Sequence, residues 1–351
     1  MNKFKKLYML SILLSVGLLI IFAGCDQTKE TGAAPGQVEQ AAAFPVVKGP
    51  YMGQVPPGLT PEIFAPEIVS RRYSEFSSVF SRDGREFYFT ISGTPYWVIA
   101  VMKQEEGRWS GPEVPPFSGK YSDCDPNLTP GGSKLFFSSR RPLEGSGPPK
   151  PDADIWYVTR TEDGWSEAVN AGPKINSEGN EYYAVFTKDG SLYFSSTRKG
   201  GKGEADIYRS RWVNGRYEEP ENIGEPVNSE FFEGDFFIDP EEKYIIVTIY
   251  GRSDTLGSGD LYISFADTDS WTPLKNMGEG VNSRYNEHCP MVSHDGKYFF
   301  FSSRRSQHKS HSETPLTYED KIKILDSCGN GYTNEDIYWV DAGIINTLRN
   351  K

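Results

Sequence analysis

Hydrophobic and polar residues follow a long repeat along this chain. Five times, a carboxylate precedes a short hydrophobic segment, which is followed at a constant spacing by a tight turn. The carboxylates are Glu75, Asp123, Glu181, Glu233 and Glu287, and the turn positions are Gly84, Gly132, Gly190, Glu242 and Gly296. A second hydrophobic and aromatic segment follows each turn and ends in small polar residues, as in Leu135 to Ser139. Such segments bounded by turns are typical of antiparallel strands.

Two further features complete each repeat. A third predicted strand opens with an acid, an aliphatic residue and an aromatic residue, as in Asp206-Ile207-Tyr208, and an Asn-Ser step such as Asn228-Ser229 closes the unit. The units recur roughly every 50 residues, the length of a four-stranded propeller blade. One small sheet cannot bury both of its faces alone, so such units stack around an axis. The sequence therefore predicts an all-β chain with a single β-propeller of four-stranded antiparallel blades, five in number, with six as the alternative.

The last repeat lacks its outer strand. No aromatic, Gly and Asn-Ser stretch follows Asp336-Ile337-Tyr338, whereas Thr60-Pro61-Glu62-Ile63 near the other end resembles the missing segment. We expect residues near 58 to 70 to complete the last blade, so that an N-terminal strand closes the ring and removes its free edges. The predicted propeller spans residues 58–351, with an insertion at about 305–333 in the last blade.

Composition agrees with this architecture and restricts the partners. An aromatic content of 14% together with 35 glycines suits many short strands joined by turns and argues against disorder. The net charge is −11, and the leader contributes only lysines to it. Such an acidic chain is a poor nucleic-acid partner, because phosphate binding needs clustered Lys and Arg.

The N-terminal segment has the features of a secretion leader. Basic residues at the start precede an apolar stretch from Leu7 to Phe22 and the sequence Phe22-Ala23-Gly24-Cys25. Residues 1–24 resemble a bacterial lipoprotein signal peptide, which implies that Cys25 is lipidated and that the propeller lies outside the cytoplasm, in the periplasm or at the cell surface. The alternative is an uncleaved membrane anchor. Residues 25–57 then read as the lipidated cysteine and a flexible tether.

The repeat also resembles a known family. Pro126-Asn127-Leu128-Thr129-Pro130-Gly131-Gly132, Phe137-Ser138-Ser139-Arg140 and Asp154-Ile155-Trp156 are similar to the TolB-like, WD-type propeller repeat of bacterial envelope proteins. The resemblance covers residues 60 to 340. It implies a propeller, and in TolB itself such a propeller binds protein partners at the envelope. TolB-like propellers are usually counted as six-bladed, whereas five units are counted in this chain.

Two charged columns recur after the second strand and at the start of the third. The arginines are Arg140, Arg198, Arg252 and Arg304, and the acids are Asp154, Asp206, Asp260 and Asp336. The first unit has Ser92 and Val98 in these places, so both charges are lost together. Paired loss predicts structural Arg/Asp pairs, since removing one partner leaves an uncompensated charge.

The column formed by Glu75, Asp123, Glu181, Glu233 and Glu287 is filled in every unit and lies on the predicted innermost strand. Three roles remain open for these acids. They could accept hydrogen bonds that join neighbouring blades, or ring one channel mouth as a ligand or ion site that suits Ca²⁺. In the third, Glu75, Asp123 and Glu181 would serve a glycoside hydrolase, which needs two carboxylates at a set separation. Because a working active site normally breaks the symmetry, a catalytic role is the less favoured one.

The last unit is where the symmetry breaks. All four histidines, His288, His294, His308 and His311, fall in it or in its insertion, and so do Cys289 and Cys328. The insertion is predicted to contain a short helix that covers one end of the propeller. Cys289 and Cys328 could form a disulfide, and a zinc site is conceivable although no tight ligand spacing supports it.

Two classes of function follow. The first is a non-enzymatic envelope lipoprotein without a cofactor, whose propeller binds a protein or a cell-wall or extracellular glycan. The alternative is an extracytoplasmic glycoside hydrolase.

Overall fold

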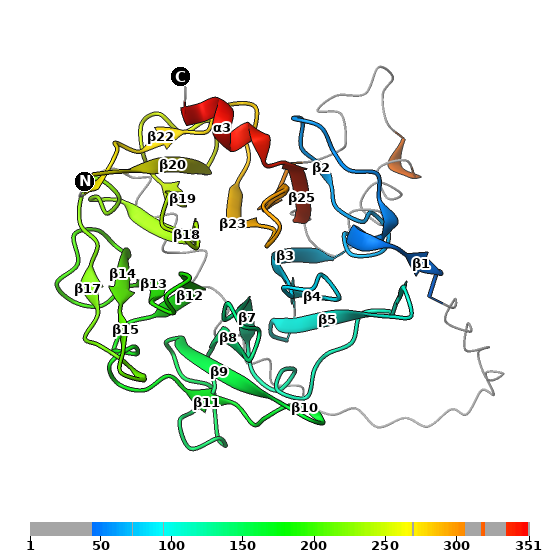
Figure 1. The fold of residues 1–351 in the computed structure, drawn as a ribbon, viewed down its shortest axis with the longest axis horizontal. Coiled ribbons are helices and arrows are strands. Elements are labelled where there is room, and N and C mark those ends of the chain that lie inside the picture. Colours follow the sequence, from blue (N-terminus) through cyan, green and yellow to red (C-terminus); the bar gives the residue numbers. More distant parts are fainter. Residues whose placement is uncertain are drawn as a thin grey trace, which may run out of the picture. The chain divides into compact units, whose positions relative to one another are not determined.

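Five small antiparallel sheets surround a central axis, so the five-bladed prediction is confirmed (Figure 1). The computed structural model describes residues 44–71, 73–93, 95–268, 270–305, 317–319 and 335–349. The predicted leader, Cys25 and most of the predicted insertion, including its helix, Cys328, His308 and His311, lie outside these residues. Phe44–Lys351 forms one unit by its internal contacts.

The first three blades follow one another along the chain. Blade 1 contains β3 (Ser74–Phe80), β4 (Glu86–Ser92), β5 (Val98–Glu105) and β6 (Arg108–Trp109), with β1 (Val47–Lys48) at its outer edge. Blade 2 contains β7 (Asp123–Leu128), β8 (Lys134–Ser139), β9 (Asp154–Thr161), β10 (Gly164–Trp165) and β11 (Val169–Asn170). Blade 3 contains β12 (Glu181–Phe186), β13 (Leu192–Ser196), β14 (Asp206–Ser210) and β17 (Glu221–Asn222), and carries the separate pair β15 (Trp212–Val213) and β16 (Arg216–Tyr217).

The last two blades complete the ring. Blade 4 contains β18 (Phe232–Ile238), β19 (Tyr244–Tyr250), β20 (Gly259–Asp267), β21 (Ser270–Trp271) and β22 (Lys275–Asn276). Blade 5 contains β23 (Glu287–Val292), β24 (Tyr298–Ser303), β25 (Asp336–Asp341) and, from the other end of the sequence, β2 (Glu62–Ile63). A helix, α3 (Gly343–Arg349), follows β25 and buries three hydrophobic side chains.

The N-terminal strand closes the last blade, as predicted. Glu62 pairs with Trp339 and Ile63 with Tyr338, and the Phe64 N–H donates to the Ile337 carbonyl at 2.8 Å. Both ends of the folded chain therefore belong to one sheet, which leaves no gap between the first and last blades.

The folded region begins earlier than residue 58, so the predicted tether is too long. β1 pairs with β6, and a 3₁₀ turn, η1 (Pro50–Gly53), follows it. Val47 and Met52 are buried in the same hydrophobic cluster as Phe64. The reason is hydrophobic burial, because this segment covers the outer edge of blade 1 and removes apolar side chains from water.

The repeated turn position explains one departure from the glycine pattern. Gly84, Gly132, Gly190 and Gly296 all have positive φ, between 68° and 88°, and Glu242 adopts the same left-handed conformation with φ 55°. Glycine reaches this region without a steric cost, so Glu242 is the strained member of the column.

The Asn-Ser steps hold each third strand to the end of its own blade. Asn228 accepts from the Ile207 N–H and donates to the Ile207 carbonyl, at 2.9 and 2.8 Å. Asn176 and Asn282 repeat this arrangement with the equivalent third strands. An asparagine can satisfy both groups of one residue because its amide offers a donor and an acceptor.

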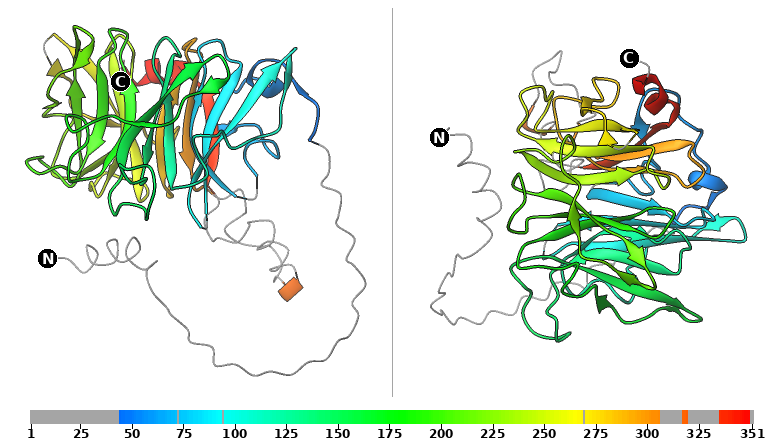
Figure 2. Two further views of the ribbon diagram at one scale, coloured as in Figure 1. Left: turned by 90° about the horizontal axis from the view of Figure 1, so that it is seen from below. Right: turned by 60° about the vertical axis from the view of Figure 1, so that its left-hand side comes forward.

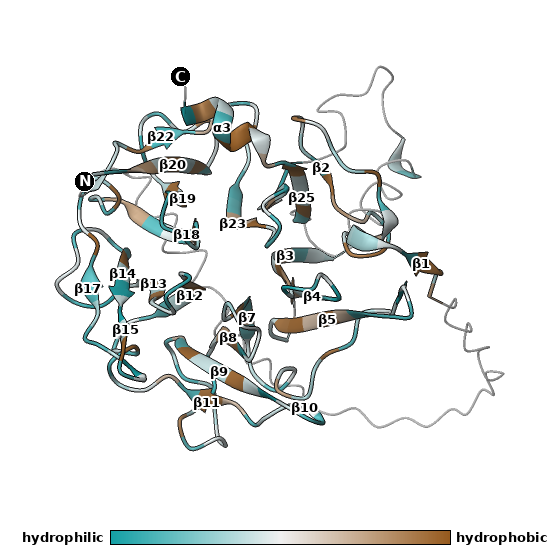
Figure 3. Cartoon of the chain, viewed as in Figure 1, coloured by the Kyte–Doolittle hydropathy of each residue, from teal (hydrophilic) through white to brown (hydrophobic). Residues whose placement is uncertain are grey.

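Hydrophobic clusters fill the spaces between neighbouring sheets, with hydrophobic residues on the strands and hydrophilic ones in the loops (Figure 3). Seen from the side, the strands run between the two faces of the ring (Figure 2). The innermost strands are β3, β7, β12, β18 and β23. We call the face at which they begin the start face, and the opposite face, with their hairpin turns, the turn face.

Candidate functional site

The five repeated acids are buried between blades rather than gathered at an open channel mouth. Each of Glu75, Asp123, Glu181, Glu233 and Glu287 is at most 1% exposed. The Ser177 N–H and hydroxyl donate to Glu181, at 2.9 and 2.6 Å, and Ser177 belongs to the segment that ends blade 2. Ser229 and Ser283 donate to Glu233 and Glu287 in the same way. This geometry agrees with the role of joining neighbouring blades.

Three of these acids are also paired with an arginine that follows the second strand. Arg141 Nη2 lies 2.7 Å from Asp123 Oδ1, Arg198 Nη2 lies 3.4 Å from Glu181 Oε1, and Arg305 Nη2 lies 3.2 Å from Glu287 Oε1. Each arginine also donates to the serine that ends its own second strand and to a carbonyl of the preceding blade. The guanidinium groups thus neutralise buried carboxylates and satisfy inter-blade carbonyls.

The Arg/Asp pairs expected from the sequence are not formed. Arg198 binds Glu181 instead of Asp206, and in blades 2 and 5 the arginine that pairs inward is Arg141 or Arg305, one residue beyond the predicted Arg140 or Arg304. Arg252 binds Asp254, and Arg304 binds Glu335. No ion pair joins Arg140, Arg198, Arg252 or Arg304 to Asp154, Asp206, Asp260 or Asp336 in the described part of the chain.

The acids at the start of the third strands stabilise loops instead. Asp206 accepts from the Lys202 N–H, and Asp260 accepts from the Leu256 N–H and from Asn276. Asp154 binds the Lys150 ammonium at 2.6 Å. Burial raises the pKa of Asp336 to about 6, and the neighbouring Glu335 raises it further. Because nearby loop groups satisfy Asp154, Asp206 and Asp260, the arginines are left for the more deeply buried acids of the innermost strands.

Blades 1 and 4 lack the inward arginine. The residue opposite the buried acid is Ile91 or Ile249 instead of serine. Burial raises the pKa of Glu75 to about 8 and that of Glu233 to about 7. Burial also raises the pKa of Asp123, although Arg141 opposes this shift. Glu75 and Glu233 are therefore largely protonated hydrogen-bonding groups at neutral pH.

We expect the free energy of unfolding to decrease as the pH rises from about 5 to about 8. The folded pKa values of Glu75 and Glu233 lie above the ordinary value of 4.5, so their stabilisation is complete below 4.5 and is lost as the pH passes 7 to 8. Glu233→Gln, which keeps a neutral side chain, should flatten this dependence in urea unfolding at several pH values. The exposed Glu178→Gln is the matched control. A stability that rises with pH, or an unchanged slope in Glu233→Gln, would contradict the assignment.

A second polar group lies between the innermost strands towards the start face. We call Asp235, His288, Cys289 and Glu335 the inner cluster. His288 Nδ1 lies 3.0 Å from Asp235 Oδ2, and His288 Nε2 contacts Glu335 Oε1. The Cys289 thiol lies 3.2 Å from both Asp235 Oδ2 and His288 Nδ1. These side chains come from blades 4 and 5 and from the residue that precedes β25.

The electrostatics of the inner cluster make the imidazole a cation. Burial alone would lower the pKa of His288, but Glu335 and Asp235 together raise it to about 10. His288 in turn holds the pKa of Glu335 below its usual range despite burial. Burial and the nearby Asp235 raise the pKa of the Cys289 thiol well above its ordinary value. In this state Cys289 is a protonated thiol and not a nucleophile, because nucleophilic attack requires the thiolate.

Asp125 lies nearby with Cys124. Its carboxylate accepts from the Cys124 thiol and the Ser138 hydroxyl, both at 3.3 Å. Burial, together with the charge of Asp235, raises the pKa of Asp125 to about 7. Cys124 and Cys289 are both free buried thiols, so the expected Cys289–Cys328 disulfide is not formed on the Cys289 side.

The sequence signal for this region lies two residues after each repeated acid. Those positions are Ser77, Asp125, Tyr183, Asp235 and Cys289. Four of the five have positive φ, and the innermost strands change register there. Unlike the repeated acids, this column differs from blade to blade. Comparison of its chemistry could have identified Asp125 and Asp235, but Glu335 follows the insertion and belongs to no column.

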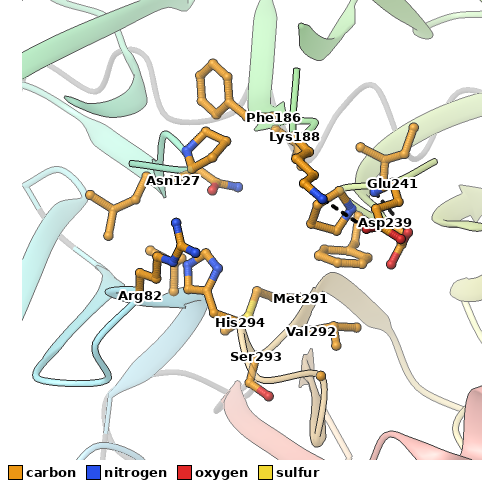
Figure 4. Close-up of a pocket in the computed structure, with 18 of the residues that line it drawn as sticks. Arg82, Asn127, Phe186, Lys188, Asp239, Glu241, Met291, Val292, Ser293 and His294 are labelled. Carbon is orange, nitrogen blue, oxygen red and sulfur yellow. Dashed lines mark hydrogen bonds and ion pairs between the residues drawn. The ribbon is translucent and has the colours of Figure 1, made fainter. Parts of the chain in front are cut away.

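A cavity of about 570 Å³ opens between the hairpin turns of the turn face (Figure 4). Arg82, Lys188, Asp239 and Glu241 contribute charged groups of both signs. Lys188 Nζ lies 3.2 Å from Glu241 Oε1, and the Lys188 N–H donates to the Pro240 carbonyl at 2.7 Å. Its hydrophobic lining includes Val185, Phe237 and Met291 from the innermost strands. The cavity offers a solvent-accessible site with no assembled catalytic group.

The sheet order and the closure by β2 define the class of this protein, which is a five-bladed β-propeller. No protein-family model matches the chain, and no curated protein matches it. Within the described residues, no helix is long and apolar enough to cross a membrane.

Solved structures of low identity share the fold. They include TolB from Acinetobacter baumannii, with 16% identity over 66% of this chain and 49% of that one and a TM-score of 0.44, so this chain spans about half the length of that protein. A structure assigned as TolB from Agrobacterium tumefaciens has 15% identity, covers 77% of this chain and 90% of that one, and has a TM-score of 0.45. The α-L-arabinofuranosidase PaAbf62A from Podospora anserina has 10% identity, covers 81% and 94%, and has a TM-score of 0.48.

Proposed function

We propose that this protein is a non-enzymatic binding module of the bacterial cell envelope, anchored through a lipid on Cys25, whose propeller binds a protein partner at the turn-face cavity. The anchor and location rest on the leader sequence, with Phe22-Ala23-Gly24-Cys25 as its processing site. The binding role rests on the cavity. Charged groups of both signs surround hydrophobic side chains there, an arrangement typical of a protein interface with a polar rim.

The buried state of the repeated acids is the observation that favours binding over hydrolysis. Glu75, Asp123 and Glu181 are the candidates for a glycoside hydrolase, and all three are buried and hydrogen-bonded between blades. Glycosidic cleavage needs two carboxylates that flank the substrate. These acids have no access to a sugar, so the hydrolase alternative has no support from them.

Site-specific photocrosslinking in the protein's own cells tests the proposal. A photoreactive amino acid at Lys188, which is exposed at the cavity, should capture one dominant envelope protein. The same amino acid at Lys199 is the control, because Lys199 is an exposed lysine of the same blade in the loop after β13, on the start face. Recovery is measured by mass spectrometry of the purified adducts.

Each other result counts against the proposal. Capture from position 199 alone would place the partner on the start face. Capture of glycan instead of protein would replace the proposed partner class. No specific adduct from either position would contradict a stable protein-binding role.

A further inference from the structure

Three different donor atoms meet in the inner cluster. Asp235 Oδ2, His288 Nδ1 and Cys289 Sγ are separated by 3.0 Å (O to N), 3.2 Å (O to S) and 3.2 Å (N to S). In the described part of the chain, this is the group of Asp, Glu, His or Cys whose possible ligand atoms all lie within 4.8 Å of one another. The set mixes oxygen, nitrogen and sulfur, unlike a simple cluster of acids.

The backbone explains how two consecutive residues face the same point. In a regular strand, His288 and Cys289 would point to opposite faces. Cys289 has φ 51°, and the register between β23 and β24 shifts directly after His288. This bulge turns both side chains towards Asp235 on β18. Bulges re-aim side chains in this way and are frequent beside functional sites.

The donor set fits a borderline divalent metal. Zn²⁺ binds Cys, His and Asp with bonds of about 2.0–2.3 Å, which place tetrahedral ligand atoms about 3.4–3.6 Å apart. The observed separations are a few tenths of an ångström shorter, as expected when the three groups hydrogen-bond to one another. A small outward movement of the side chains would therefore admit the ion.

The surroundings of His288 match those of a metal ligand. Glu335 contacts Nε2, and Arg304 Nε lies 3.3 Å from the same Glu335 oxygen. Metal-ligating histidines usually donate their other ring N–H to a carboxylate, which fixes the ring. Glu335 therefore leaves Nδ1 as the coordinating atom. The Asp235 side chain is 22% exposed, so the site is not sealed from solvent.

The geometry points to a zinc site formed by Asp235, His288 and Cys289, oriented by Glu335. These three ligands leave a fourth tetrahedral position for water or an exogenous ligand. The inference is independent of the proposed binding function, because none of these four residues lines the turn-face cavity.

Metal binding by the full-length chain tests the inference. After removal of metal with a chelator, titration with Zn²⁺ should give one bound ion per chain that Asp235→Asn, His288→Gln or Cys289→Ser each abolishes. With Co²⁺ in place of Zn²⁺, the wild-type protein should show a thiolate-to-cobalt charge-transfer band. Glu335→Gln should weaken Zn²⁺ binding by about 10- to 100-fold, since the carboxylate positions the ligand histidine without touching the ion.

The chain provides matched controls. Cys124→Ser removes the other buried thiol and should leave Zn²⁺ binding and the cobalt band unchanged, as should Cys328→Ser. Circular dichroism shows whether each variant is folded. Absence of a stoichiometric ion, or a cobalt complex of the folded wild-type protein without a thiolate band, would overturn the inference. So would Zn²⁺ binding that survives in folded Asp235→Asn and Cys289→Ser.

Discussion

Replacing Arg141 by methionine is expected to lower the free energy of unfolding by about 3–5 kcal/mol, the cost of breaking a buried ion pair from one side. Arg141 is 8% exposed, and its guanidinium donates to Asp123 Oδ1 at 2.7 Å and to the Phe117 carbonyl at 2.9 Å. Without it, Asp123 remains buried without a cation. Urea unfolding at neutral pH measures the loss.

The neighbouring residue is the matched control for this prediction. Arg140 is exposed and forms no ion pair with any described residue, so Arg140→Met should change stability by less than about 0.5 kcal/mol. The double variant Asp123→Asn with Arg141→Met should be less destabilised than the sum of the two single variants, since neither charge is then left alone. A larger loss in Arg140→Met than in Arg141→Met would restore the pairing frame expected from the sequence.

Phe64→Ala is expected to cost about 3–5 kcal/mol, in the range of large-to-small substitutions in a packed core. Phe64 is fully buried beside the closing strand β2. Its ring lies 5.2 Å from those of Phe300 and Trp339, and 5.3 Å from that of Phe87, between the first and last blades. The substitution opens a cavity where the ring closes. Denaturant unfolding and amide exchange of β25 measure the effect.

Leu59→Ala is the control for the closure, because Leu59 belongs to the same segment but is 56% exposed. It should change stability by at most about 0.5 kcal/mol. Equal effects of the two substitutions would show that the segment contributes no specific packing. A loss below about 1 kcal/mol in Phe64→Ala would show that closure does not depend on this side chain.

The fold was predictable because each blade repeats the same local chemistry. Turn residues such as Gly132 and Gly190 fix the hairpins, and the missing outer strand of the last unit indicated that β2 would pair with β25. These signals are local in the sequence and depend on backbone conformation. The position of residues 44–57 was not predictable in the same way, since their burial depends on tertiary contacts with blade 1.

The side-chain pairs were harder to predict, because they depend on register. Two consecutive arginines, Arg140 and Arg141, follow β8, and the repeat alone does not show which of them turns inward. The structure resolves this through Ser139, which pairs with Asp123 across the strands and so places the residue two positions later against that acid. Blade 3 has the same spacing at Ser196 and Arg198.

The inner cluster was missed for a related reason. Strict alternation along β23 would place only one of His288 and Cys289 on the channel side. The bulge at Cys289 breaks this alternation, and nothing in the local sequence marks it. Glu335 joins the cluster only through the position of β25. The differences between blades were visible in the sequence, but the irregular backbone that gives them a shared location was not.

The pairing of β2 with β25 also has a consequence for biosynthesis. The strand partners lie near opposite ends of the chain, so the ring cannot close until almost the whole polypeptide has been made. Contacts between such distant segments form slowly, because a large loop-closure entropy opposes them. A chain that closes last is suited to export as an extended polypeptide, with the final blade assembling after translocation.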